Sequence, residues 1–177
     1  MEEIIQNGIM VKDTGEILLS THRHDYRTIE VGPDKIHCMV DGGRAYIRRG
    51  WGHSKREQEL IEKEGPEAFY KNEPPNAATC DLASLIEDIS LSNESTAEDV
   101  AKYLCWGTRD INGDQPLKYI FIKDCTQDHL DALLEYAKTS PVSQMHLTVM
   151  KYWQSTKGRR SNLRLLEQIV KAYKSPE

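Results

Sequence analysis

Residues 9–49 read IMVKDTGEILLSTHRHDYRTIEVGPDKIHCMVDGGRAYIRR, and this stretch decides the fold of the N-terminal half. Short apolar and β-branched runs alternate here with Gly, Pro and Asp at intervals of about ten residues. The runs are residues 9–12, 16–20, 28–31, 35–40 and 45–47. Such spacing is typical of strands joined by tight turns, and it predicts a small antiparallel β meander.

The hydrophobic period changes after this region. In three C-terminal segments the apolar residues recur every three to four positions, as they do on the buried face of a helix. Hydroxyl side chains that can cap a helix precede the periodic segments, at Ser54, Thr96, Thr126, Ser140-Pro141 and Ser161. We also expect a short helix over residues 82–89, and Gly158 to end the helix that Ser140 begins.

Residues 117–122 (LKYIFI) form a nearly continuous apolar run, which is typical of a strand covered on both faces. Because the backbone groups of a buried strand need partners, we expect this strand to join the N-terminal sheet. The predicted fold class is therefore α+β: a small N-terminal antiparallel β meander, and a C-terminal helical subdomain that contributes one further strand. The predicted division is residues 1–70, a linker at 71–80 around Pro74-Pro75, and residues 81–177.

Composition narrows the class of protein. The chain has 177 residues, 38% of them hydrophobic, and its longest apolar run is far too short to span a membrane. The N-terminal MEEIIQNGIM lacks the basic start of a signal peptide, so we expect a cytoplasmic protein without a membrane partner. The four cysteines are widely spaced without a CxxC pair, which favours reduced, mostly buried thiols.

The net charge of −5 is unevenly distributed. Residues 44–56 carry five basic residues and no acid, residues 57–99 carry twelve acids and two lysines, and residues 151–174 carry seven basic residues and one acid. Such blocks steer charged partners, or else they pair with each other inside the fold. For the turn Lys157-Gly158-Arg159-Arg160, complementation of a helix end is favoured over nucleic-acid binding.

The densest chemistry lies at residues 20–26 (STHRHDY) and 41–43 (DGG). If there is a catalytic or metal-binding centre, its candidates are His22, His24, Asp25 and Asp41, since imidazole and carboxylate groups serve acid–base and ligand roles. A histidine–aspartate network that fixes a loop is the favoured alternative.

A basic stretch interleaved with aromatic residues follows. Arginine binds phosphate in a bidentate manner and aromatic rings stack on bases. The candidate ligand-binding residues are therefore Arg23, His24, Asp25, Asp41, Tyr46, Arg48 and Arg49. A solvated strand face is the alternative. No phosphate-binding loop, dinucleotide fingerprint or zinc-spaced cysteine set is present, so we expect no cofactor and no metal.

Residues 9–50 resemble a module of small uncharacterised bacteriophage and prophage proteins. Its pattern is I-x-C-x-x-C-G-[DE]-x-I-x-S-x-x-R-H-D-F-x-x-C-x-C-G, followed by V-D-G-G-x-x-Y-[IL]-R-R. The chain matches it at Ile9, Gly15, Glu16, Ser20, Arg23, His24, Asp25, Gly32, Val40, Asp41, Gly42, Gly43, Tyr46, Ile47, Arg48 and Arg49. The four cysteine positions hold Val11, Thr14, Ile29 and Val31. The resemblance implies a zinc-ribbon-like knuckle that has lost its metal and is held by apolar packing.

A second stretch, from Trp106 to Leu130, also resembles a segment of phage-encoded small proteins. The resemblance implies a phage accessory protein that acts in the infected host cell, with counter-defence as a candidate role. A binding role is favoured over an enzymatic one, with a host or defence-system protein or a small phosphate-bearing, nucleotide-like ligand as partner. The alternatives are a phosphodiester hydrolase using the His/Asp cluster, a less favoured nucleic-acid-binding protein, and a homo-oligomer.

Overall fold

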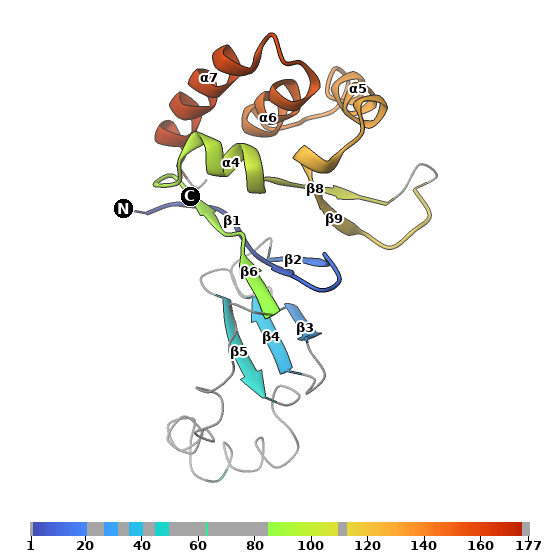
Figure 1. The fold of residues 1–177 in the computed structure, drawn as a ribbon, viewed down its shortest axis with the longest axis vertical. Coiled ribbons are helices and arrows are strands. Elements are labelled where there is room, and N and C mark those ends of the chain that lie inside the picture. The colour runs from blue at the N-terminus through green and yellow to red at the C-terminus, as the bar shows by residue number, and fades with distance from the viewer. Residues whose placement is uncertain are drawn as a thin grey trace. The chain divides into compact units, whose positions relative to one another are not determined.

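The computed structural model describes residues 2–20, 27–31, 36–40, 45–49, 63, 85–109 and 113–174, with only the backbone for residue 20 and the three strands within 27–49 (Figure 1). The described residues form strands in the N-terminal half and four helices in the C-terminal half, so the α+β class is confirmed. They group into two compact units, one of residues Ile9–Asp88 and one of Met1–Gly8 with Ile89–Glu177.

Strands β2 (Ile17–Ser20) to β5 (Ala45–Arg49) follow the predicted runs, whereas β1 (Ile4–Val11) begins five residues before the run predicted at 9–12. In the unit Ile9–Asp88, β3 (Arg27–Val31), β4 (Ile36–Val40) and β5 pair antiparallel in chain order, which confirms the meander. β1 turns into β2 (Ile17–Ser20) through Gly15, whose φ of 72° is in the left-handed region that glycine adopts most readily. The Gly15 N–H donates to the Val11 carbonyl at 2.8 Å, which closes this turn.

The prediction of a helix over residues 82–89 is wrong at Ile86–Asp88, because these residues form strand β6. β6 pairs antiparallel with the second half of β1, with Ile9 opposite Asp88 and Val11 opposite Ile86. A short apolar run fits either period, and here the unpaired backbone edge of β1 decides the outcome. β7 (Leu91–Ser92) pairs in the same sense with the first half of β1.

In the unit of Met1–Gly8 and Ile89–Glu177, β9 (Lys118–Phe121) confirms the strand expected at 117–122, but its expected partner is wrong. β9 pairs with β8 (Cys105–Thr108) in a two-stranded antiparallel sheet. Gly107 concealed β8 in the sequence, because glycine is depleted in strands. A Cβ at Gly107 would lie 3.3 Å from the Tyr119 ring, so glycine lets the cross-strand partner lie close.

The helices of this unit are α4 (Ala97–Tyr103), α5 (Gln127–Tyr136), α6 (Gln144–Gln154) and α7 (Arg159–Ala172), with the short 3-10 helix η2 (Ile122–Asp124) before α5. Thr96 and Thr126 cap α4 and α5 as expected. Two other starts are wrong: α6 is capped by Ser143 rather than Ser140, and Ser161 lies inside α7, whereas Ser54 lies outside the described residues. Gly158 does not end α6, because it is the N-cap of α7.

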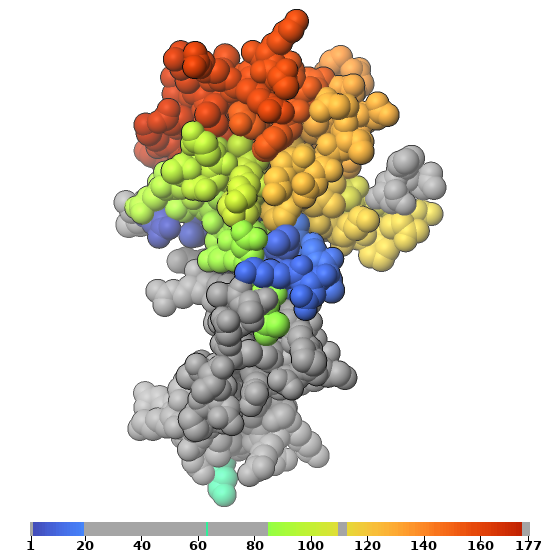
Figure 2. Space-filling view, in the orientation of Figure 1, coloured from blue at the N-terminus to red at the C-terminus, as the bar shows by residue number. Residues whose placement is uncertain are grey.

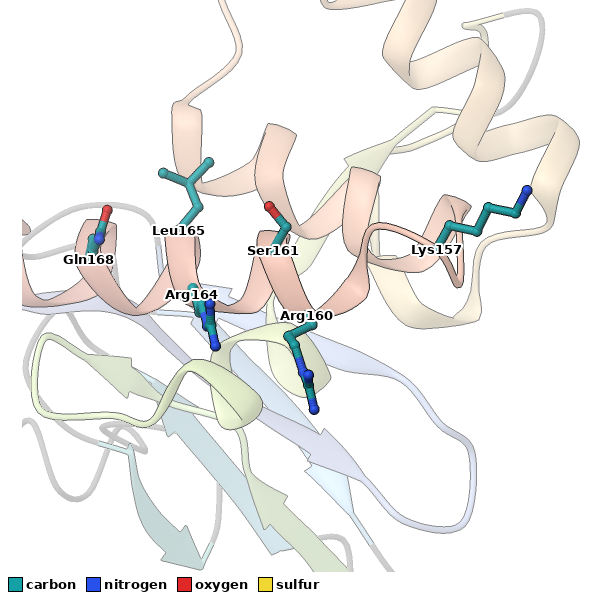
Figure 3. A pocket seen from close by; sticks show the side chains of 6 residues that line it. All are labelled: Lys157, Arg160, Ser161, Arg164, Leu165 and Gln168. Carbon is teal, nitrogen blue, oxygen red and sulfur yellow. The ribbon is translucent and has the colours of Figure 1, made fainter.

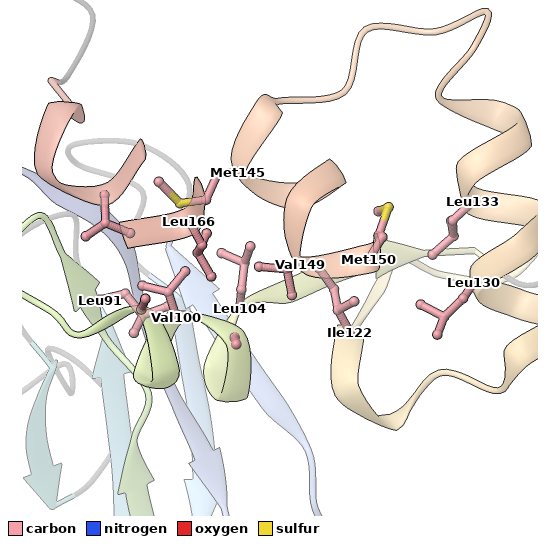
Figure 4. Close-up of a cluster of buried hydrophobic side chains, with 13 residues drawn as sticks. Leu91, Val100, Leu104, Ile122, Leu130, Leu133, Met145, Val149, Met150 and Leu166 are labelled. Carbon is pink, nitrogen blue, oxygen red and sulfur yellow. The ribbon is translucent and has the colours of Figure 1, made fainter. Parts of the chain in front are cut away.

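A single apolar cluster holds these helices together (Figure 4). It draws on β7, α4, η2 and α5 to α7, and its fully buried members include Val100, Leu104, Ile122, Val149 and Leu166. Burial of such side chains contributes roughly 1.5–3 kcal/mol each.

Gln6 of β1 is buried beside the cluster, and its amide makes three hydrogen bonds. Its Nε2 donates to the carbonyls of Ile89 and Tyr103, both at 2.9 Å, and its Oε1 accepts from Cys105 N–H at 2.9 Å. Gln6 therefore fastens the first strand to the C-terminal elements of this unit.

Candidate functional site

The residues singled out at 22–25 and 41 lie outside the described part of the chain. These are His22, Arg23, His24, Asp25 and Asp41. Tyr46, Arg48 and Arg49 lie on β5, opposite Met39, His37 and Ile36 of β4, where the backbone alone is described. Their convergence on a site stays a prediction.

Two of the four positions that hold cysteine in the phage module have described side chains. Val11 is buried with 5% of its surface exposed, whereas Thr14 is exposed in the turn. Ile29 and Val31 lie on β3, where only the backbone is described. Among the described residues, no cluster of three or more His, Cys, Asp or Glu is arranged to hold a metal ion, and no helix is long and apolar enough to cross a membrane.

The outer side of α7 carries a shallow groove of about 410 Å³ (Figure 3). Six residues line it: Lys157, Arg160, Ser161, Arg164, Leu165 and Gln168. The five from Arg160 to Gln168 recur at helical spacing and share one face of α7, opposite the buried Leu166 and Val170, and Lys157 lies just before the helix. We call Lys157, Arg160 and Arg164 the basic face. All three are exposed, and the end of α6 and α7 form one outer surface of their unit (Figure 2).

The basic face begins where the helix dipole is already positive. Gly158, the N-cap of α7, provides no side-chain hydrogen bond, and the first turn contains no acidic residue. The expectation that this basic turn complements a helix end is confirmed for Arg159, whose Nε donates to the Tyr152 carbonyl in the last turn of α6, and is wrong for Arg160, which lies in the first turn of α7. Positive charge is unfavourable at a helix N-terminus, so this arrangement costs stability.

Arg159 has a separate, structural place. Its guanidinium lies 5.3 Å from the Trp153 ring centre and 5.6 Å from that of Tyr152, and its Nε donates to the Tyr152 carbonyl at 3.3 Å. The Trp153 indole in turn donates to the Ala101 carbonyl of α4 at 2.8 Å. Arg159 therefore secures the α6–α7 junction and does not line the groove.

The basic face has no carboxylate partner among the described residues. The one acid of α7, Glu167, pairs with Lys171 at 3.0 Å. Within the parts of the chain whose side chains are described, no Asp or Glu comes within ion-pair distance of Lys157, Arg160 or Arg164. Three of the seven basic residues in the block at 151–174 thus lie at this groove. Arg164 and Gln168 were not predicted as site residues from the sequence. Their spacing of four residues, from Arg160 and from Arg164, does indicate a shared helix face.

A second groove, of about 460 Å³, lies between α5 and α6. It is lined by Leu134, Ala137, Lys138, Leu147, Lys151, Gln154, Ser155 and Asn162. Lys138 is already paired with Glu135 at 2.5 Å, which leaves Lys151 as the cation of this lining without such a pair. Its chemistry is mixed, and it favours no particular ligand.

Ser143 and His146 form a serine–histidine pair at the start of α6. Ser143 Oγ and His146 Nδ1 lie 2.6 Å apart, and the same Oγ accepts the His146 backbone N–H at 3.2 Å. The His146 ring also bonds the backbone of Cys105 and contacts the Trp106 ring edge-on, with 5.9 Å between ring centres. Ser143 is thus a serine N-cap whose hydroxyl accepts the N–H of the third helical residue and is also bonded by that residue's ring. Neither groove is lined by the pair, so we interpret it as a helix cap.

The two cysteines with described side chains are free thiols. Burial raises the pKa of Cys105 to about 12 and that of Cys125 to about 11. Because the thiolate is the nucleophilic form, both groups are unreactive at neutral pH. The basic face therefore remains the candidate site among the described residues.

Comparison of the chain with protein-family models, with curated proteins and with solved structures yields no match, so the resemblance to the phage module stays a prediction.

Proposed function

We propose that this chain is a non-enzymatic binding module that holds a phosphate-bearing ligand on the basic face of α7. The observation that carries the proposal is the cationic surface at Lys157, Arg160 and Arg164, which has no carboxylate partner among the described residues and of which Arg160 lies in the first turn of α7. An external anion would offset the electrostatic cost of this arrangement.

The side chains of the groove suit phosphate oxygens. Arg160 and Arg164 offer planar, bidentate donors, and Lys157 adds a mobile point charge. Ser161 and Gln168 line the same groove and provide neutral donors. Exposed ion pairs contribute only about 0.2–1 kcal/mol each, so several phosphate contacts together are needed for useful affinity.

The phage-accessory role, with a partner in the infected cell, remains part of this proposal through the resemblance of residues 9–50. A hydrolase acting through His22, His24, Asp25 and Asp41 is not part of this proposal, because those residues lie outside the described part of the chain.

The test is calorimetric titration with inorganic tripolyphosphate at low salt. Wild-type protein is compared with the double variant Arg160→Glu/Arg164→Glu and with the control Lys118→Glu/Lys138→Glu, which changes the net charge equally at exposed sites outside this groove. We expect the first variant to weaken binding at least about tenfold, or about 1.4 kcal/mol, and the control to change it less than about twofold. Equal losses in both variants would show that net charge alone is responsible, and would overturn the proposed site.

A further inference from the structure

The two arginines of the basic face lie along one edge of α7 (Figure 3). Arg160 and Arg164 are one helical turn apart, which corresponds to about 6 Å along the axis of α7. Lys157 lies just before the start of the helix, with its side chain extending in a different direction from the two arginines (Figure 3), and α7 itself is about 21 Å long. In Figure 3, Arg160 and Arg164 extend side by side from the same edge of the helix, and Leu165 lies on the other edge. Charges spaced along one edge of a helix match an extended polyanion better than a compact one.

The groove also lacks the features that recognise a nucleobase. None of its six lining residues is aromatic. The aromatic rings before α7, Tyr152 and Trp153, meet edge to face with 4.9 Å between their centres, and both are covered by Arg159. A small nucleotide is held in sites of this kind by enclosure and base stacking. This surface provides no enclosure and no ring for base stacking. Contacts to a phosphate backbone require neither of these features.

We infer that the ligand of the basic face is a nucleic-acid strand, bound through its phosphodiester backbone and without sequence preference; the inference rests on the proposed function. Non-specific binding of this kind depends on cations facing the phosphates rather than on base contacts. Successive phosphates of one strand lie about 3.4 Å apart along a duplex axis, so arginines one turn apart reach neighbouring or alternate phosphates.

The acidic total charge does not oppose this inference, because the charges are segregated. Residues 151–174 carry seven basic residues and one acid within a chain of net charge −5, and that acid, Glu167, is paired with Lys171. The opposite side of α7 is fixed in the core by Leu166 and Val170, so the basic face points outward at all times. The local potential at this face, rather than the total charge, sets the attraction for a polyanion.

Counterion release gives a quantitative expectation. If Lys157, Arg160 and Arg164 each neutralise one phosphate, the logarithm of the affinity for single-stranded DNA falls with the logarithm of salt concentration with a slope of about −2. Removing both arginine charges with Arg160→Gln/Arg164→Gln lowers this slope to about −0.7. A variant that merely distorted the fold would lower affinity without such a stepwise change in slope.

The experiment measures fluorescence anisotropy of labelled single-stranded DNA of 24 nucleotides, in several unrelated sequences, with ATP and tripolyphosphate as competitors. We expect the same affinity for all sequences, a slope near −2, and competition by ATP at least about tenfold weaker than by unlabelled DNA. The control variant Lys118→Gln/Lys138→Gln is expected to keep the wild-type slope, and thermal melts establish that each variant is folded.

Three outcomes would overturn the inference, and they separate it from the proposed function. If ATP or tripolyphosphate competes as well as the DNA, the extended-strand inference fails but phosphate binding by the module stands. If affinity depends strongly on sequence, backbone recognition fails in the same limited way. If neither DNA nor tripolyphosphate binds, both the inference and the proposed function fail.

Discussion

The backbone N–H groups at the start of a helix need hydrogen-bond acceptors, and the starts of α6 and α7 differ in whether the chain supplies them. At α6, the Ser143 hydroxyl accepts a backbone N–H and bonds the His146 ring, so the helix start is completed from within. At α7, Gly158 supplies no side chain, the first turn contains no acid, and Arg160 adds positive charge to the positive pole. Uncapped helix starts leave backbone N–H groups without partners. The start of α6 is stabilised by its own side chains, whereas for the start of α7 we propose stabilisation by an external anion.

The largest expected effect is at α7, where binding and stability should move in opposite directions. Arg160→Glu places an acid in the first turn, which favours the helix by about 0.3–1 kcal/mol, whereas it removes a phosphate ligand and repels the ligand. With Arg164→Glu added, binding should fall at least about tenfold while the melting temperature stays level or rises. Anisotropy and calorimetric melting measure the two quantities. Parallel losses of affinity and stability would mean that the arginines are structural.

The matching change at α6 should have the reverse profile. Ser143→Ala removes the cap and leaves the His146 N–H without its side-chain partner, so we expect a loss of about 0.5–2 kcal/mol in the free energy of unfolding. Affinity for DNA should be unchanged, because Ser143 does not line the groove. Urea denaturation gives the free energy. A loss of binding without a loss of stability would contradict the interpretation of Ser143 as a cap.

The α6 start should also respond to pH. Burial lowers the pKa of His146 below its ordinary value of 6.5, although the hydrogen bond to the Cys105 backbone works in the other direction. As pH falls through 6.5, the unfolded chain takes up the proton first, so the contribution of the neutral ring to stability is complete above that pH and is lost below it. Melting temperatures of wild type and His146→Gln between pH 8 and 5 measure this loss. An unchanged pH dependence in the variant would contradict the assignment.

The smallest effect should come from giving α7 the cap that it lacks. Gly158→Ser supplies a hydroxyl at the N-cap, and its stabilisation is expected to be only a few tenths of a kcal/mol because glycine is itself tolerated there. The new Cβ would lie 3.0 Å from the Asn162 side-chain amide, which must move slightly. Thermal melting detects the change, with Gly158→Ala as the control without a hydroxyl. Equal stability of the two variants would show that the α7 start gains nothing from a cap.

Local chemistry within the sequence was sufficient for the strands of the meander and for two helix starts. Turn residues such as Gly15 set the strand boundaries, and the hydroxyls of Thr96 and Thr126 bond N–H groups only three residues away. Such short-range features depend on neighbours in the chain, so they can be read without knowing the fold. The basic block at residues 151–174 was likewise visible in the sequence.

Pairing and helix boundaries required the tertiary structure. β9 pairs with β8 and not with the N-terminal sheet. Glycine at position 107 leaves room for the Tyr119 ring on the partner strand, but it also lowers the strand propensity by which β8 could have been predicted. Ser143 rather than Ser140 begins α6, where the His146 ring can bond the Cys105 backbone. The start of α7 at Arg159 determines which basic residues lie in its first turn and which lie before the helix.

The sequence by itself determined that positive charge gathers near the C-terminus, since composition is independent of conformation. Only the tertiary structure decided that Lys157, Arg160 and Arg164 line one outward groove, while Arg159, next to Arg160, contacts the rings of Tyr152 and Trp153. The physical reason is that burial of Leu166 and Val170 fixes the rotation of α7 about its axis, and a helix turned in this way assigns each neighbouring residue to a different environment.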